Sequence, residues 1–318
     1  MIDYFGFLNL PSSICFDGVR IVPREGFAKI HNYIESISNK NGYIYPPMTQ
    51  NVEVDITTME TKRIIPNTEK PAILYKLPFS HSINIENPFY KKDLRKWDYS
   101  FLVNSLAFVN GTRLQFYNWY FDNRVPTKNT DNIHLSPNGH SDFFQTIYET
   151  WKSWSEINKA RIINLLALHS RIPSYEWDFE RFMLNYMVFD GAYSIAEKVY
   201  ICKSNSHKNN FHSVIDKFGL INNDAYIDNI YNLRNDLFHH AIWDGGSPTS
   251  AADKYKGWMH EITLRKFNLR FIIALLNYKT DFIATPWWTI MLSTIDPHNY
   301  NKKANVRRIN AKSAQVMN

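Results

Sequence analysis

Hydrophobic and polar positions follow two different periods along this chain. Up to about residue 95, short runs alternate between apolar and polar residues, as half-buried strands do. Three such runs are Val52–Ile56, Ile73–Leu77 and Ile83–Ile85, and prolines punctuate them. A helix is predicted after Pro23 from apolar residues at helical spacing, namely Phe27, Ile30, Ile34 and Ile37. We therefore expect a mixed α/β domain over residues 1–95.

From about Trp97 onward the pattern is that of amphipathic helices. Residues 101–108 are apolar and predicted helical, and residues 122–140 are rich in Pro, Asn, Asp and Thr, so 96–140 is interpreted as a helix plus a linker. Four longer helices follow: one from a Ser141 cap to Leu168, one from Phe179 to Tyr200, one from Asp224 to Ile242, and one from Trp258 to Tyr278. The predicted fold class is therefore α+β, with a mixed N-terminal domain followed by an all-α helical bundle at 141–296.

Positive charge is concentrated at one end of the chain. The 318 residues carry a formal net charge of +6, but the residues after Asp296 contain no acid and five bases. The rest of the chain therefore sums to 6 − 5 = +1, which is close to neutral. Residues 297–318 are predicted to be a basic, disordered tail, with a nucleic-acid-binding arm as the alternative.

Other features limit the location and the chemistry. Two distant cysteines give no disulfide framework, and the start lacks a basic segment followed by an apolar run, so we expect a cytoplasmic protein. The most apolar stretch, Phe271–Leu276, is too short to span a bilayer, so no membrane contact is predicted. The sequence has no glycine-rich phosphate loop and no complete set of metal ligands, so we expect no cofactor and no metal.

The segment with the clearest chemical potential is Tyr231–His240, on the third helix of the predicted bundle. At about 100° of turn per residue, the apolar stripe of this helix consists of Ile227, Ile230, Leu237, Phe238 and Ala241. Arg234 falls within the stripe, where a guanidinium needs a partner or a function. His239 lies about 140° further round. Either the helix is disturbed near Phe238, or the two side chains meet in a groove shared with another helix or another subunit.

The preceding helix offers partners for this arginine. Asp190 and Glu197 are seven residues apart and both fall on its predicted apolar stripe. Two carboxylates on a buried face, with an arginine on the next helix, indicate a buried ion pair. On this interpretation the two carboxylates hold Arg234 in place by ion pairing and do not themselves contact substrate.

The spacing resembles the signature of the HEPN-domain ribonucleases, an arginine, a polar residue, a short spacer and a histidine. Arg234 and Asn235 match its start and His239 matches its histidine, while His240 fits the longer spacer that also occurs. The tyrosine that follows the histidine in certain HEPN toxins is absent, because Ala241 and Ile242 stand there.

The resemblance implies metal-independent cleavage of RNA, in which the ribose 2′-hydroxyl attacks the adjacent phosphorus. It further implies a homodimer with a composite cleft, and a role as a toxin or phage-defence effector. Residues 1–95 would then sense a regulatory protein or ligand. Catalytic roles fall to Arg234 and His239, with Asn235 in support and His240 as the alternative histidine. The competing hypothesis is a non-catalytic module that binds RNA, a nucleotide or a protein, in which Arg234 is structural. Aromatic richness alone suggests a third, carbohydrate-binding reading.

Overall fold

The first strand of the chain lies inside an antiparallel sheet that later segments complete. The computed structural model describes residues 2–88, 97–116, 119–129, 131, 133–136, 139–243, 257–289 and 293–295. The sheet has the order β2-β3-β7-β1-β8. Its strands are β1 (Ile2–Gly6), β2 (Ile14–Phe16), β3 (Val19–Pro23), β7 (His81–Ile85) and β8 (Gln115–Phe116). β7 alternates buried and half-buried residues, so one face of it packs on the core, as its period-two sequence predicts.

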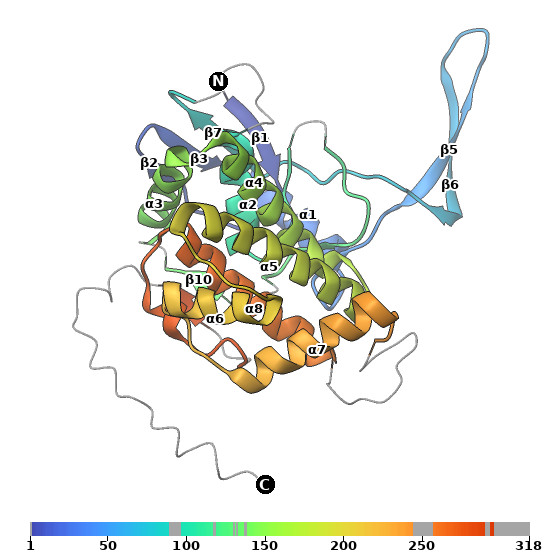
Figure 1. Ribbon diagram of the computed structural model, residues 1–318. Helices are drawn as coiled ribbons and strands as arrows, with labels where there is room; N and C mark the ends of the chain where they lie inside the picture. The colour runs from blue at the N-terminus through green and yellow to red at the C-terminus, as the bar shows by residue number, and fades with distance from the viewer. Residues whose placement is uncertain are drawn as a thin grey trace.

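Smaller strand pairs surround this sheet. A long hairpin, β5 (Met48–Val54) with β6 (Thr61–Pro71), extends away from the rest of the molecule (Figure 1). β4 (Tyr43–Ile44) pairs with β9 (Val125–Pro126), and β10 (Ile133–Leu135) runs parallel to β11 (Ser293–Ile295). These pairs join segments that are far apart in the sequence. Two of the strands, β9 and β10, lie in the region 96–140 that was expected to be a helix plus a linker.

Helices make up most of the remainder of the described chain. They are α1 (Phe27–Ile37), α2 (Asp98–Val109), α3 (His140–Ser153), α4 (Glu156–Arg171), α5 (Asp178–Tyr200), α6 (His207–Phe218), α7 (Asp224–His240) and α8 (Gly257–Leu275), with short 3-10 turns η2 (Ile172–Ser174) and η3 (Asp281–Ala284). The α5 and α8 helices pack together, and α6 and α7 lie against them at one side of the bundle (Figure 1). Among the described helices, none combines the length and the apolarity needed to cross a bilayer.

One hydrophobic core runs from the sheet into the helices. Every residue of α2 is buried, and its Phe101 ring stacks on Trp151 of α3 with centroids 4.8 Å apart. The same apolar cluster contains Phe5 of β1 and Ile272 of α8. A helix that is apolar all round is expected inside a core and not at a surface, so α2 joins the sheet to the bundle.

The α+β fold class is confirmed, with an antiparallel sheet in the N-terminal part and helices after it. Four details of the prediction are wrong. The helix expected from Ser141 to Leu168 is two helices, because the chain is extended at Trp154 and Ser155, and its N-cap residue is Gly139. Residues 73–77 form an isolated bridge through Tyr75 in place of a strand. The supposed loop 122–140 contains β9 and β10. Helix α6, between the second and third of the longer predicted helices, was not predicted. The predicted basic tail, 297–318, lies outside the described residues.

Candidate functional site

Helix α7 has well-defined ends that fix the position of the motif. The side chain of Asn223 accepts a hydrogen bond from the Tyr226 backbone N–H, which caps the first turn. At the other end Ala241 adopts the left-handed conformation, with φ of 55°. The N–H groups of Ala241 and Ile242 then donate to the carbonyls of Leu237 and Asp236, both at 3.1 Å. The helix is regular up to His240, so the first of the two alternatives, a disturbed helix near Phe238, does not apply.

The buried face of α7 differs from the predicted stripe. Ile227, Ile230 and Leu233 are fully buried, whereas Phe238 is 44% exposed and Ala241 is exposed. Prediction of Phe238 and Ala241 as buried was wrong. Arg234 is half-buried beside Leu233, at the border between the core and the solvent.

Arg234 and His239 are in direct contact within one chain. Arg234 Nη1 donates to His239 Nε2 at 3.1 Å and to Asn235 Oδ1 at 3.0 Å. The expectation that the two side chains could not meet on a straight helix is wrong. Five residues rise about 7.5 Å along a helix axis, and the long arginine side chain reaches along and around the surface far enough to touch the ring.

The contact defines the state of the histidine. A guanidinium has no acceptor atom, so the imidazole nitrogen that faces it must accept. His239 is therefore neutral in this arrangement, with its proton on Nδ1. The ring is exposed to solvent, and His240 lies beside it with ring centroids 6.4 Å apart. A neutral, accessible imidazole is the form that can take up a proton.

Aromatic rings hold the other side of the arginine. The Arg234 Cζ atom lies 5.7 Å from the ring centroid of Tyr186 on α5 and 5.3 Å from that of Phe238. Tyr186 is itself fully buried, so the guanidinium rests on a fixed surface. Arg234 Nε is buried, and the Nε–H group of the Arg234 guanidinium makes no hydrogen bond to the described residues.

The predicted carboxylate partners occupy different positions from those expected. Asp190 is half-buried on α5, and its Oδ1 faces His207 Nδ1 of α6 at 3.4 Å. Burial raises the pKa of Asp190, while the charges of His207 and Arg234 act to lower it. Arg234 therefore senses Asp190 electrostatically, and the close partner of the carboxylate is His207. Glu197 is exposed, so its prediction as a buried partner was wrong.

Tyr186 connects these groups. The centroid of the Tyr186 ring lies 6.4 Å from that of the His207 ring, and the same Tyr186 ring also contacts the Arg234 guanidinium. Burial, and after it the charge of Asp190, raises the pKa of the Tyr186 hydroxyl well above its ordinary value. The hydroxyl has no hydrogen-bond partner within the described part of the chain. It is a neutral donor at any physiological pH.

We call these residues together the α7 cluster: Tyr186, Asp190, His207, Arg234, Asn235 and His239. His207 was not assigned to it from the sequence, because helix α6, which His207 begins, was not predicted. The signal was present nonetheless: Ser206 caps α6 by accepting from the Asn209 N–H, and apolar residues at helical spacing follow it. Asp190 and His207 are the two polar groups that α5 and α6 contribute.

Other ligand sets are not assembled in the residues that the structure covers. No three His, Cys, Asp or Glu side chains there form a group that could hold a metal ion. Comparison of the chain with protein-family models, with curated proteins and with solved structures finds no match in any of the three.

Proposed function

We propose that this protein is an endoribonuclease that cleaves RNA through attack of the ribose 2′-hydroxyl on the adjacent phosphorus. The observation that carries the proposal is the 3.1 Å contact between Arg234 Nη1 and His239 Nε2 at an exposed helix surface. It brings a cation and a neutral imidazole to one place, and these are the two groups that this reaction requires.

The roles follow from the chemistry of each group. His239 Nε2 takes the proton of the 2′-hydroxyl as the 2′-oxygen forms a bond to phosphorus. The bond between phosphorus and the 5′-oxygen then breaks, which leaves a 2′,3′-cyclic phosphate and a 5′-hydroxyl. Arg234 stabilises the negative charge that grows on the phosphoryl oxygens, and Asn235 Oδ1 holds the guanidinium in orientation. Substrate binding must draw Arg234 away from His239, because Nε2 accepts from it in the free protein.

The departing 5′-oxygen needs a proton, and we propose that His207 donates it. Its Nδ1 faces the Asp190 carboxylate, which leaves Nε2 as the nitrogen that exchanges a proton with substrate. The His207 side chain is 45% exposed, so solvent and RNA can reach it. His239 contacts Arg234, and the His207 ring lies 6.4 Å from the ring of Tyr186, which also contacts Arg234. We therefore propose that a phosphate bound by Arg234 lies within reach of both histidines.

The wider setting of the proposal rests on the resemblance to HEPN ribonucleases. It includes a homodimer, a cytoplasmic location, a role as a toxin or phage-defence effector, and control by a protein or ligand bound to residues 1–95. The contact within one chain removes the geometric reason for a composite site, so the dimer now depends on the resemblance alone. The need for a 2′-hydroxyl restricts cleavage to RNA.

Purified protein is tested on structured and unstructured RNA in the presence of EDTA, and the product ends are mapped. We expect cyclic-phosphate and 5′-hydroxyl ends from the wild type. Arg234→Ala and His239→Ala should each lower the rate by a factor of about a hundred or more, as removal of an acid–base group commonly does. His240→Ala is the matched control, because it removes the neighbouring exposed imidazole and should leave the rate within a few-fold. Intact RNA with the folded wild type, or equal cleavage by the His239 and His240 variants, would contradict the proposal.

A second function is favoured by one specific observation, the packing of Arg234 on Tyr186 and Phe238. In this alternative the arginine ties α7 to α5 and the protein binds RNA, a nucleotide or a protein partner without cleaving it. Arg234→Ala would then lower the thermal stability markedly and His239→Ala would not, and neither RNA nor DNA would be cut.

A further inference from the structure

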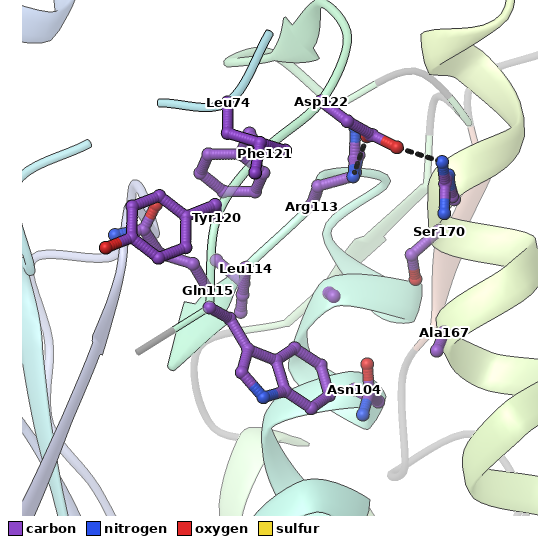
Figure 2. Close-up of a pocket in the computed structure, with 13 residues that line it drawn as sticks. Leu74, Asn104, Arg113, Leu114, Gln115, Tyr120, Phe121, Asp122, Ala167 and Ser170 are labelled. Carbon is purple, nitrogen blue, oxygen red and sulfur yellow. Dashed lines mark hydrogen bonds and ion pairs between the residues drawn. The ribbon is translucent and has the colours of Figure 1, made fainter. Parts of the chain in front are cut away.

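A cavity of about 250 Å³ lies away from the α7 cluster, where the N-terminal part meets helices α2 and α4. Its wall is formed by Asn104 of α2, by Ala167 and Ser170 of α4, and by residues 113–115 and 119–122 (Figure 2). The volume lies just below the roughly 300–1,000 Å³ of common ligand pockets. It suits a ligand about as large as one nucleotide.

Two arginines share one carboxylate at the edge of this cavity. Arg113 Nη2 donates to Asp122 Oδ1 at 3.0 Å, and Arg171 Nη2 donates to Asp122 Oδ2, as the dashed lines of Figure 2 show. Two positive charges against one negative charge leave a net charge of +1 at the wall. Burial lowers the pKa of Arg113, and Asp122 opposes this effect only in part. A second anion would therefore be favourable here.

These guanidinium groups retain unused donors. Each guanidinium has five N–H groups. The bonds of Arg113 go to Asp122 and, from Nη1, to Ser174 Oγ at 3.3 Å. Arg171 Nε is buried and has no hydrogen-bond partner within the described residues. The two forks come from separate elements, a loop and the end of α4, and Asp122 occupies only part of their donors. A phosphate with three free oxygens can therefore accept from both forks beside Asp122.

The opposite wall is aromatic and partly open. Trp119 is 40% exposed and Tyr120 is 52% exposed, which is unusual for large rings that line a cavity. The Lys76 ammonium lies 4.3 Å from the Tyr120 ring centroid and adds positive charge on that side. Exposed aromatic faces near arginines are a surface on which a base can stack.

We propose that this cavity binds a nucleoside monophosphate, with the phosphate on Arg113 and Arg171 and the base against Trp119 or Tyr120. The site shares no residue with the α7 cluster, so the proposal does not depend on RNA cleavage. If the protein is a ribonuclease, the cavity lies where a small regulatory ligand could act on it through α4 and the packed bundle.

Calorimetric titration of the full chain with AMP, GMP, CMP and UMP tests this, with adenosine and inorganic phosphate as separate probes. At least one monophosphate should bind at micromolar to millimolar concentration. Adenosine and phosphate alone should each bind at least tenfold more weakly. Arg171→Gln and Trp119→Ala should each weaken monophosphate binding about tenfold or more, which corresponds to about 1.4 kcal/mol. Arg20→Gln, an exposed arginine on β3, is the control and should bind normally.

Three outcomes would overturn the assignment. No binding of any monophosphate at millimolar concentration would leave the two arginines as a structural clamp on Asp122. Binding that survives both Arg171→Gln and Trp119→Ala would place the ligand elsewhere. Binding lost in Arg234→Ala but kept in Arg171→Gln would place it in the α7 cluster. Trp119→Ala, at an exposed position, keeps the test valid if Arg171→Gln fails to fold.

Discussion

At the scale of single residues, the length of the arginine side chain determines the geometry of the site. An angular plot of α7 records where each Cα–Cβ bond points, and on that basis Arg234 and His239 diverge by about 140°. The plot ignores the reach of the guanidinium, which lies well beyond Cβ. The sequence therefore identified the two residues that meet but not how they meet. Their contact forms within one helix, so it gives no geometric argument for a dimer.

Replacement of Arg234 by lysine tests whether the planar fork matters beyond its charge. Lysine keeps the positive charge but cannot hold Asn235 and His239 with the same two-sided geometry. We expect the single-turnover cleavage rate of Arg234→Lys to fall at least tenfold, with the melting temperature close to that of wild type. Arg20→Lys serves as the matched control on an exposed strand. A lysine variant that cleaves at the wild-type rate would show that charge alone is sufficient.

At the scale of elements, the long periodic segments were predictable and the breaks were not. Helices α1, α2, α5, α7 and α8 follow from their apolar spacing. The division between α3 and α4 was missed because Trp154 continues the apolar repeat across the break. Helix α6 was missed because its first turn, residues 207–210, is entirely polar and hides the spacing of Phe211, Val214 and Ile215. That omission concealed His207, so half of the polar surroundings of Asp190 could not be foreseen from sequence.

The C-terminal end of α7 contains a strained residue. Ala241 has φ of 55°, a left-handed conformation that costs a residue with a Cβ atom roughly 1–2 kcal/mol. Glycine adopts it freely but loses more conformational entropy on folding. We expect Ala241→Gly to raise the free energy of unfolding by about 1 kcal/mol, as measured by urea denaturation.

The control for this change is Ala225→Gly, an exposed position inside the first turn of α7. There glycine should lower the free energy of unfolding by about 0.5–1 kcal/mol. If both variants lose stability, the left-handed end of α7 is not present in solution, and the positions of His239 and His240 would have to be revised.

At the scale of the whole molecule, one core joins the sheet and the bundle, and buried polar networks are set into it. Arg265 of α8 donates to Asp131 Oδ2 at 2.8 Å and to the carbonyl of His169 at 2.6 Å. At the sheet, His81 Nε2 lies 2.9 Å from the Leu10 carbonyl, and Nδ1 lies 2.9 Å from Ser80 Oγ. The carbonyl can only accept, so Nε2 of His81 carries a proton. Burial lowers the pKa of His81 to about 4, so near neutral pH Nδ1 has no proton and accepts from the Ser80 hydroxyl.

These two buried histidines make the fold sensitive to acid. Burial lowers the pKa of His81 to about 4, and burial followed by the Arg265 charge lowers that of His169 to about 3. A histidine whose folded pKa lies below its unfolded value of 6.5 binds fewer protons when folded. Its contribution is complete above pH 6.5 and is lost as pH falls toward the folded value. Each histidine should remove about 2 kcal/mol from the free energy of unfolding between pH 7 and pH 5.

The diagnostic quantity is the slope of stability against pH, because Asp190 and Glu261 have pKa values raised by burial and gain stability as pH falls. His81→Gln should lower stability at every pH, since it disturbs the bonds to Leu10 and Ser80. Its loss between pH 7 and pH 5 should nevertheless be about 2 kcal/mol smaller than that of wild type. Parallel curves for wild type and His81→Gln would mean that His81 is solvated and titrates normally, and that the sheet-side core is more open than its buried side chains indicate.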